Sequence, residues 1–117
     1  MRPLPSVLGS YNESQGPVEM TSRVYADQAG LYLHIPSHIR NRLEVVVGNR
    51  IEGRLERLES DGGESRSIQA DTVFEVKGYW HEMRLTDDVV KRFEIREGDV
   101  LYLFLDRVIR YHEVVDA

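Results

Sequence analysis

One segment of this chain recurs 50 residues further along, and this recurrence limits the folds that the chain can adopt. Leu33–Val45 aligns with Met83–Ile95 without a gap, and the same offset continues through the turn glycines Gly48 and Gly98. A repeated unit is a supersecondary structure that does not bury its apolar face alone. With 117 residues the chain has the length of one ordinary domain, so we expect both copies to share one core.

Each copy begins with the alternation of apolar and polar residues that is typical of a half-buried strand. This alternation covers Leu31–Ile35 in the first copy and Met83–Leu85 in the second. Shorter strands and turns are predicted before them, as strands at Arg23–Ala26 and Thr72–Val76 and as turns at Asp27–Gly30 and Lys77–Tyr79.

A helix of about two turns is predicted after each of these strands. Pro36 suits a first helical turn because it has no N–H group, and Thr86 offers an oxygen that can cap the next helix. Apolar residues spaced i, i+4 then mark the buried face, namely Ile39 with Leu43 and Val89 with Phe93. The glycines that follow, before Asn49 and Asp99, predict turns.

The strand that ends each copy differs between the two. In the first copy Arg50, Glu52 and Arg54 form a charged outer face, whereas Val100–Leu105 is apolar on both faces. The outward residues of this second strand are therefore a predicted interface, made by Val100, Tyr102 and Phe104. Either a final strand at Val108–Val115 or a second chain covers it, and we favour a two-fold homodimer.

The sequence thus predicts a mostly β fold with short helices, a small β-barrel built from two strand–helix–strand repeats. We expect a flexible arm at residues 1–20 because no sustained period is present there. The first unit then covers 21–58, a linker covers 59–70 because 59–65 is rich in Gly, Ser and acidic residues, and the second unit covers 71–117.

The stretch Ile35–Leu43, followed by Val47–Ile51, resembles the AbrB/SpoVT family of swapped-hairpin DNA-binding domains. Leu85–Leu105 looks like a more diverged second copy of the same unit. The resemblance implies a barrel of interlocked hairpins, here in a tandem form such as that of MraZ-like proteins. It also implies transcriptional regulation, with antitoxins among the family's roles.

Basic side chains of the first copy predict where double-stranded DNA would bind. By resemblance, Arg40 and Arg42 match basic positions of the family's helix, and Arg92 is the counterpart of Arg42 in the second copy. The same phosphate-binding patch would include further basic residues nearby, namely His38, Arg50, Arg54 and Arg57. A DNA-binding transcriptional regulator is therefore our first functional hypothesis.

The charge distribution keeps a second hypothesis open. The net charge is −5, which argues against non-specific coating of nucleic acid. Residues 1–58 hold seven basic and six acidic side chains, whereas 59–117 hold eight and fourteen. If Glu44, Glu52 and Glu56 balance the arginines of the first copy, the chain is instead an acidic protein-interaction or assembly module on the same barrel.

No residue pattern predicts catalysis, a cofactor or a metal ion. The chain has no cysteine, and His34 and His38 fall on a predicted strand and a predicted helix, so they do not share one helical face. Asp87 and Asp88 suit a helix start, where negative charge is favourable. The lack of a long apolar run and of a secretory signal pattern predicts a cytoplasmic protein without a membrane partner.

Overall fold

The computed structural model describes residues 17–78 and 82–109, which form a mostly β fold with two short helices. In chain order the elements are β1 Val18–Arg23, β2 Tyr25–Asp27, β3 Gly30–His34, α1 Ser37–Leu43, β4 Arg50–Glu59, β5 Ser65–Lys77, β6 Glu82–Arg84, α2 Asp87–Phe93 and β7 Val100–Ile109. The strand and helix expected in each copy are thus present.

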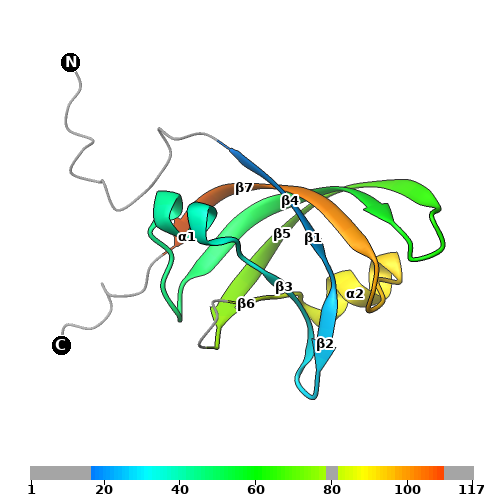
Figure 1. The fold of residues 1–117 in the computed structure, drawn as a ribbon, viewed down its shortest axis with the longest axis horizontal. Helices are drawn as coiled ribbons and strands as arrows, with labels where there is room; N and C mark the ends of the chain where they lie inside the picture. Colours follow the sequence, from blue (N-terminus) through cyan, green and yellow to red (C-terminus); the bar gives the residue numbers. More distant parts are fainter. Residues whose placement is uncertain (1–16, 79–81, 110–117) are drawn as a thin grey trace.

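The seven strands form one antiparallel sheet in the order β1-β7-β4-β5-β6-β3-β2. The first and last strands of this order, β1 and β2, are consecutive in the chain and are separated by Val24 alone. The two ends of the sheet therefore meet in one bent segment, and the sheet curls on itself as in a small β-barrel (Figure 1).

The core consists of the inward side chains of the curled sheet together with one face of each helix. Along β4 and β7 buried residues alternate with more exposed ones, as the sequence predicts for strands with one face on a core. Fully buried side chains include Leu33, Ile51, Leu55, Phe74, Met83, Leu101 and Leu105. Ile39 and Leu43 of α1 and Val89 of α2 are buried as predicted, while Phe93 is only partly buried against the same core.

Part of the element order recurs at an offset of 50 residues. The bounds of α1 and α2 differ by 50, and so do those of β4 and β7. Each helix ends in a left-handed residue, Glu44 with φ 55° and Glu94 with φ 52°. The pairing of β4 with β7 is symmetrical about Arg54 and Phe104, and that of β3 with β6 about Leu33 and Met83.

The turn that contains Gly48 and the turn that contains Gly98 are held by equivalent hydrogen bonds. Asn49 Oδ1 accepts a hydrogen bond of 2.9 Å from the Val46 N–H, and Asp99 Oδ2 accepts one of 2.9 Å from the Arg96 N–H. Both side chains are buried, at 5% exposure each. The glycine N–H groups, with φ of 99° and 95°, donate to Val76 O and Val24 O respectively. The prediction of turn chemistry is confirmed here.

The N-termini of the helices differ in how they are capped. Thr86 is the N-cap of α2, and its Oγ1 accepts a hydrogen bond of 3.3 Å from the Val89 N–H, as predicted. Pro36 is itself the N-cap of α1 and makes no side-chain capping bond. We predicted that Pro36 lies in the first helical turn, but it lies one residue before that turn.

The structure differs from the predicted boundaries in three places. Residues 18–20 belong to β1 and not to an arm, because Val18 and Met20 are buried against β7. Most of the expected linker is strand, since β4 runs to Glu59 and β5 starts at Ser65, and a five-residue hairpin turn at 60–64 connects them. Val108 and Ile109 end β7 and do not begin a separate strand, and residues 110–117 lie outside the described part of the chain.

Candidate functional site

Three arginines predicted for DNA binding lie on the outward face of β4. Arg50, Arg54 and Arg57 are exposed or half-buried, whereas Ile51 and Leu55 on the other face are buried. They do not form one cluster, because seven residues of extended chain place the first and third roughly 23 Å apart.

Two of these arginines are held by neighbouring side chains. Arg54 Nε lies 2.8 Å from Glu56 Oε2, and its Nη1 lies 3.1 Å from Asp71 Oδ1. The hydrogen bonds that Arg54 donates to Asp71 and, to a smaller extent, to Glu56 raise the pKa of Arg54. The guanidinium of Arg57 lies 3.7 Å above the centre of the Tyr102 ring. A phosphate group would therefore compete with existing partners at both positions.

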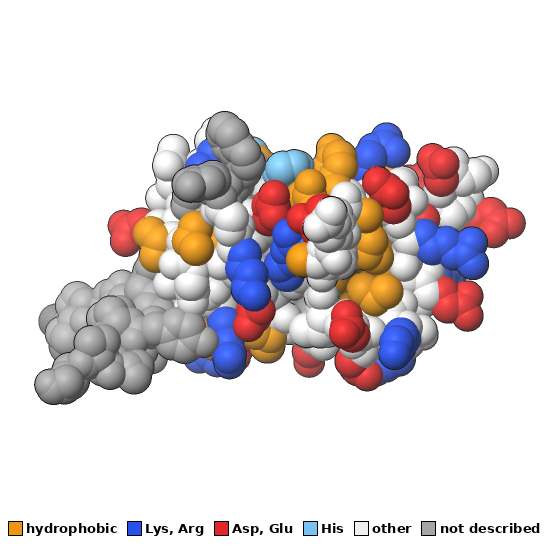
Figure 2. All heavy atoms as spheres, turned by 90° about the horizontal axis from the view of Figure 1, so that it is seen from below, with side chains coloured by type: hydrophobic (Ala, Val, Ile, Leu, Met, Phe, Trp, Pro, Cys, Tyr) orange, Lys and Arg blue, Asp and Glu red, His pale blue; other side chains and the backbone are white. Residues whose placement is uncertain are grey.

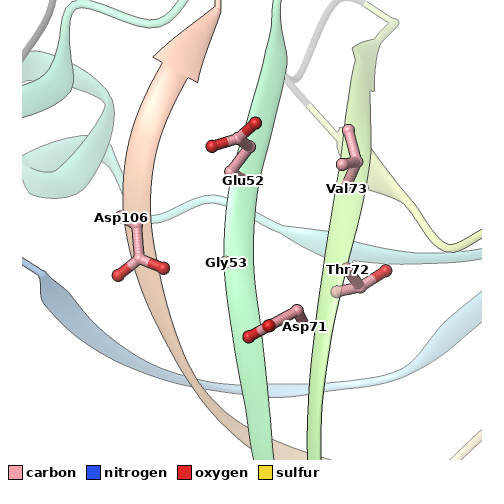
Figure 3. Close-up of a pocket in the computed structure, with 6 residues that line it drawn as sticks. All are labelled: Glu52, Gly53, Asp71, Thr72, Val73 and Asp106. Carbon is pink, nitrogen blue, oxygen red and sulfur yellow. The ribbon is translucent and has the colours of Figure 1, made fainter.

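Carboxylates from three adjacent strands surround Gly53 on the same face (Figure 3). Glu52, Asp71 and Asp106 line a shallow pocket of about 410 Å³, which Thr72 and Val73 complete. Gly53 is required here because a Cβ atom would collide with the Phe104 carbonyl oxygen. Within residues 17–78 and 82–109, no three His, Cys, Asp or Glu side chains converge as metal ligands do.

Two of these pocket carboxylates already have cationic partners. Glu52 Oε1 accepts hydrogen bonds of 3.0 Å and 2.7 Å from Arg107, and Asp71 accepts the bond from Arg54 described above. Charges of both signs are therefore paired along this part of the sheet, and the face has no continuous basic surface.

The remaining basic residues predicted for DNA binding lie on the helices. His38 and Arg42 are exposed on α1 and Arg40 is half-buried there. Arg92 is on α2, with its Nη1 at 3.8 Å from Asp88 Oδ2. Because the two helices lie at opposite ends of the curled sheet, Arg92 is separate from the α1 group (Figure 1).

The predicted interface residues Val100, Tyr102 and Phe104 are half-buried on the outward face of β7. Backbone hydrogen bonds from β1 and β4 occupy both edges of this strand, so a further strand cannot pair with it. The Tyr102 hydroxyl donates a hydrogen bond of 2.9 Å to Glu59 Oε1. The three side chains thus remain available from the outer side and are partly screened by the polar groups of β4.

An aromatic cluster on the hairpin of β2 and β3 was not predicted from the sequence. The ring centres of Tyr25 and Tyr32 are 5.8 Å apart, and those of Tyr25 and His34 are 4.9 Å apart. Tyr25 is 37% exposed and His34 is exposed as well. We call Tyr25, Tyr32, His34 and Asp27 the hairpin surface. Tyr32 and His34 were visible as the outward positions of a strand, but the pairing with Tyr25 depends on the hairpin register.

Arg84 of β6 connects this hairpin to the second copy. Its guanidinium donates two hydrogen bonds to the Asp27 carboxylate, at 2.7 Å and 2.5 Å, and one of 3.0 Å to Glu82. The hydrogen bond from Arg84 lowers the pKa of Asp27 to about 2, so this carboxylate is ionised at neutral pH. Burial and the neighbouring Glu82 carboxylate raise the pKa of Tyr32.

No protein-family model and no curated protein matches the sequence. Among solved structures, the solution structure of PHS018 from Pyrococcus horikoshii is similar over 80% of this chain and 94% of its own, with a TM-score of 0.57. The sequences are 15% identical, so the likeness concerns the fold. Neither helix of the described residues is long and apolar enough to span a membrane.

Proposed function

We propose that this chain is a non-catalytic assembly module that pairs with a second copy of itself through the outward face of β4 and β7. The observation that carries the proposal is the combination of apolar and paired charged groups on that face. Val100, Tyr102 and Phe104 are half-exposed, while Arg54 and Arg107 beside them are neutralised by carboxylates. Burial of such a face against a partner gains apolar contact, and the charges that are already paired cost less to bury than unpaired ones.

The order of charges along β4 suits a second copy as the partner. Outward residues alternate in sign in the order Arg50, Glu52, Arg54, Glu56. When two copies of an alternating row face each other across a two-fold axis, each cation can be placed opposite an anion. A two-fold interface uses the same patch on both subunits, so a self-complementary patch is what it requires.

We also propose that the two halves of the chain are copies of one swapped-hairpin unit of the AbrB-like type. The coincident bounds of α1 with α2, the equivalent caps and the symmetrical registers of β4 with β7 support this duplication. The duplicated unit also supports assembly as the function, because each half already pairs with the other by antiparallel strands.

DNA-binding transcriptional regulation is the second candidate, and one difference between the helices favours it. Helix α1 has Arg40 and Arg42 in its last turn and no acidic residue in its first turn. Helix α2 has Asp87 and Asp88 in its first turn. If the protein binds double-stranded DNA, the contact therefore belongs to the α1 end of the molecule.

Sedimentation velocity over a range of concentrations tests the assembly proposal. We expect the wild type to dimerise and the double variant Tyr102→Glu, Phe104→Arg to remain monomeric, because the variant brings unpaired charge into the contact. Val46→Arg with Val47→Glu is the matched control, since these valines are 53% and 52% exposed and the second copy has Arg96 and Glu97 there. A wild type that is monomeric at high micromolar concentration overturns the proposal.

Retention on a DNA resin at increasing salt tests the second candidate. Neutralising a phosphate contact lowers the slope of log affinity against log salt by roughly one. If the protein binds DNA, we therefore expect the double variant Arg40→Gln, Arg42→Gln to have a less steep dependence of log affinity on log salt. The double variant Lys91→Gln, Arg92→Gln should change this dependence less. Equal losses from the two pairs would contradict the placement on α1, and no retention of the wild type at low salt would remove the candidate.

A further inference from the structure

The outward aromatic side chains of β3 have charged counterparts in the second copy. Strands β3 and β6 pair symmetrically, so that each position of one has a counterpart 50 residues away in the other. The counterpart of Tyr32 is Glu82, and that of His34 is Arg84. Within this one strand pair Tyr32 stands opposite Arg84 and His34 stands opposite Glu82, so the same strand positions carry aromatic side chains in β3 and charged ones in β6.

The hairpin surface projects from the molecule and is open to a partner. Figure 1 shows the hairpin of β2 and β3 extending below the curled sheet, and Figure 2 looks onto that side. Hydrophobic side chains there lie next to acidic and basic groups. Tyr25 and Asp27, both on β2, are among the exposed residues, and the carboxylate of Asp27 retains 40% exposure.

The net charge of the hairpin surface favours binding of a cationic ligand. Asp27 and Glu82 supply two negative charges, and Arg84 supplies one positive charge that both of them share. One negative charge therefore remains beside the exposed rings. The Asp27 carboxylate is fixed in place by Arg84 and also accepts a 2.9 Å hydrogen bond from the Ala29 N–H, so it is held in position for a ligand.

We propose that the hairpin surface binds an arginine side chain of a partner polypeptide. A guanidinium group is planar, stacks on aromatic rings and forms paired hydrogen bonds with a carboxylate, whereas a lysine ammonium is a compact point charge. The same chain stacks Arg84 over Tyr32 at 4.9 Å and Arg57 over Tyr102 at 3.7 Å. This surface is separate from the β4 and β7 face, so the inference goes beyond the proposed self-association.

Titration of the ¹⁵N-labelled full chain with a blocked Gly-Arg-Gly peptide, followed by NMR, tests the proposal. We expect chemical-shift changes confined to residues 25–34 and 82–84. The citrulline analogue has the same shape without the charge, and we expect it to bind at least about fivefold more weakly. The double variant Tyr102→Glu, Phe104→Arg should bind the peptide like the wild type, so a failure of self-association does not affect this result.

Two single substitutions test whether the aromatic ring of Tyr25 itself binds the peptide or whether any surface substitution lowers the affinity. Tyr25→Leu keeps an apolar side chain and should weaken peptide binding about fivefold, because it removes the ring face. Val47→Ala, at an exposed position outside both proposed contact surfaces, is the control and should leave the affinity unchanged. The proposal is overturned by an absence of binding, by equal affinity for the citrulline peptide, by equal losses in the two variants, or by tighter binding of a single-stranded oligonucleotide at the same residues.

Discussion

At the scale of single residues, the ion pair of Asp27 and Arg84 has the clearest chemical consequence. The two residues are 57 positions apart, and their side chains link β2 to β6 across β3. Arg84 is only 16% exposed, so its guanidinium depends on the Asp27 and Glu82 carboxylates for compensation. Removing either carboxylate leaves more positive charge uncompensated in the sheet.

The pKa of Asp27 predicts a dependence of stability on pH. Folding lowers this pKa from 3.8 to about 2, so the unfolded chain takes up the proton first as the pH falls. The stabilisation is therefore complete above about pH 4 and is lost as the pH falls towards 2. We expect Asp27→Asn to lower the free energy of unfolding at pH 7 and to differ less from the wild type near pH 2. Urea denaturation at several pH values measures this, and a difference that is constant with pH would refute it.

Among the secondary-structure elements, the turns before β4 and β7 are stabilised by a buried polar side chain and by backbone hydrogen bonds to distant segments. Each turn buries one polar side chain that accepts a hydrogen bond from the backbone N–H three residues earlier. Each also exchanges backbone hydrogen bonds with a distant strand, through Val24 for the Gly98 turn and through Val76 for the Gly48 turn. The turns therefore position the long strands relative to β1 and β5.

Substitution of Asp99 tests this role. Asp99→Ala leaves the Arg96 N–H without its acceptor, so we expect a loss of about 1–3 kcal/mol in the free energy of unfolding. Asp99→Asn keeps an acceptor oxygen, and Asn49 already performs this role in the first copy, so we expect a much smaller loss. Thermal or chemical denaturation of the two variants gives the comparison, and equal destabilisation by both would show that the charge matters and the hydrogen bond does not.

At the scale of the whole molecule, closure of the sheet decides which side chains are available to a partner. β1 and β2 form the two ends of the strand order, and their junction at Val24 brings these ends together. The outward faces of β4 and β7 and of the β2–β3 hairpin then lie on different strands of one curled sheet. The two surfaces for which we propose partners are separate on one small domain because of that closure.

The local elements and their repetition can be predicted from the sequence alone. Alternation along Leu31–Ile35, the spacing of Ile39 with Leu43 and the turn glycines are local properties, since strand and helix periods are set by the backbone. The offset of 50 residues also predicted the bounds of α2 and β7 from those of α1 and β4. Among the residues predicted for binding, the sequence identified the outward positions of β4 and β7 correctly.

The partners of these side chains depend on contacts between segments that are far apart in the sequence. Val18 and Met20 are strand residues because β7 covers them, which no short-range pattern indicates. Arg54 of the predicted basic patch is paired with Asp71, and Arg84 is paired with Asp27, because segments far apart in the sequence meet in the sheet. The aromatic hairpin surface likewise arises from the register of β2 with β3, and register is a property of paired strands rather than of either strand alone.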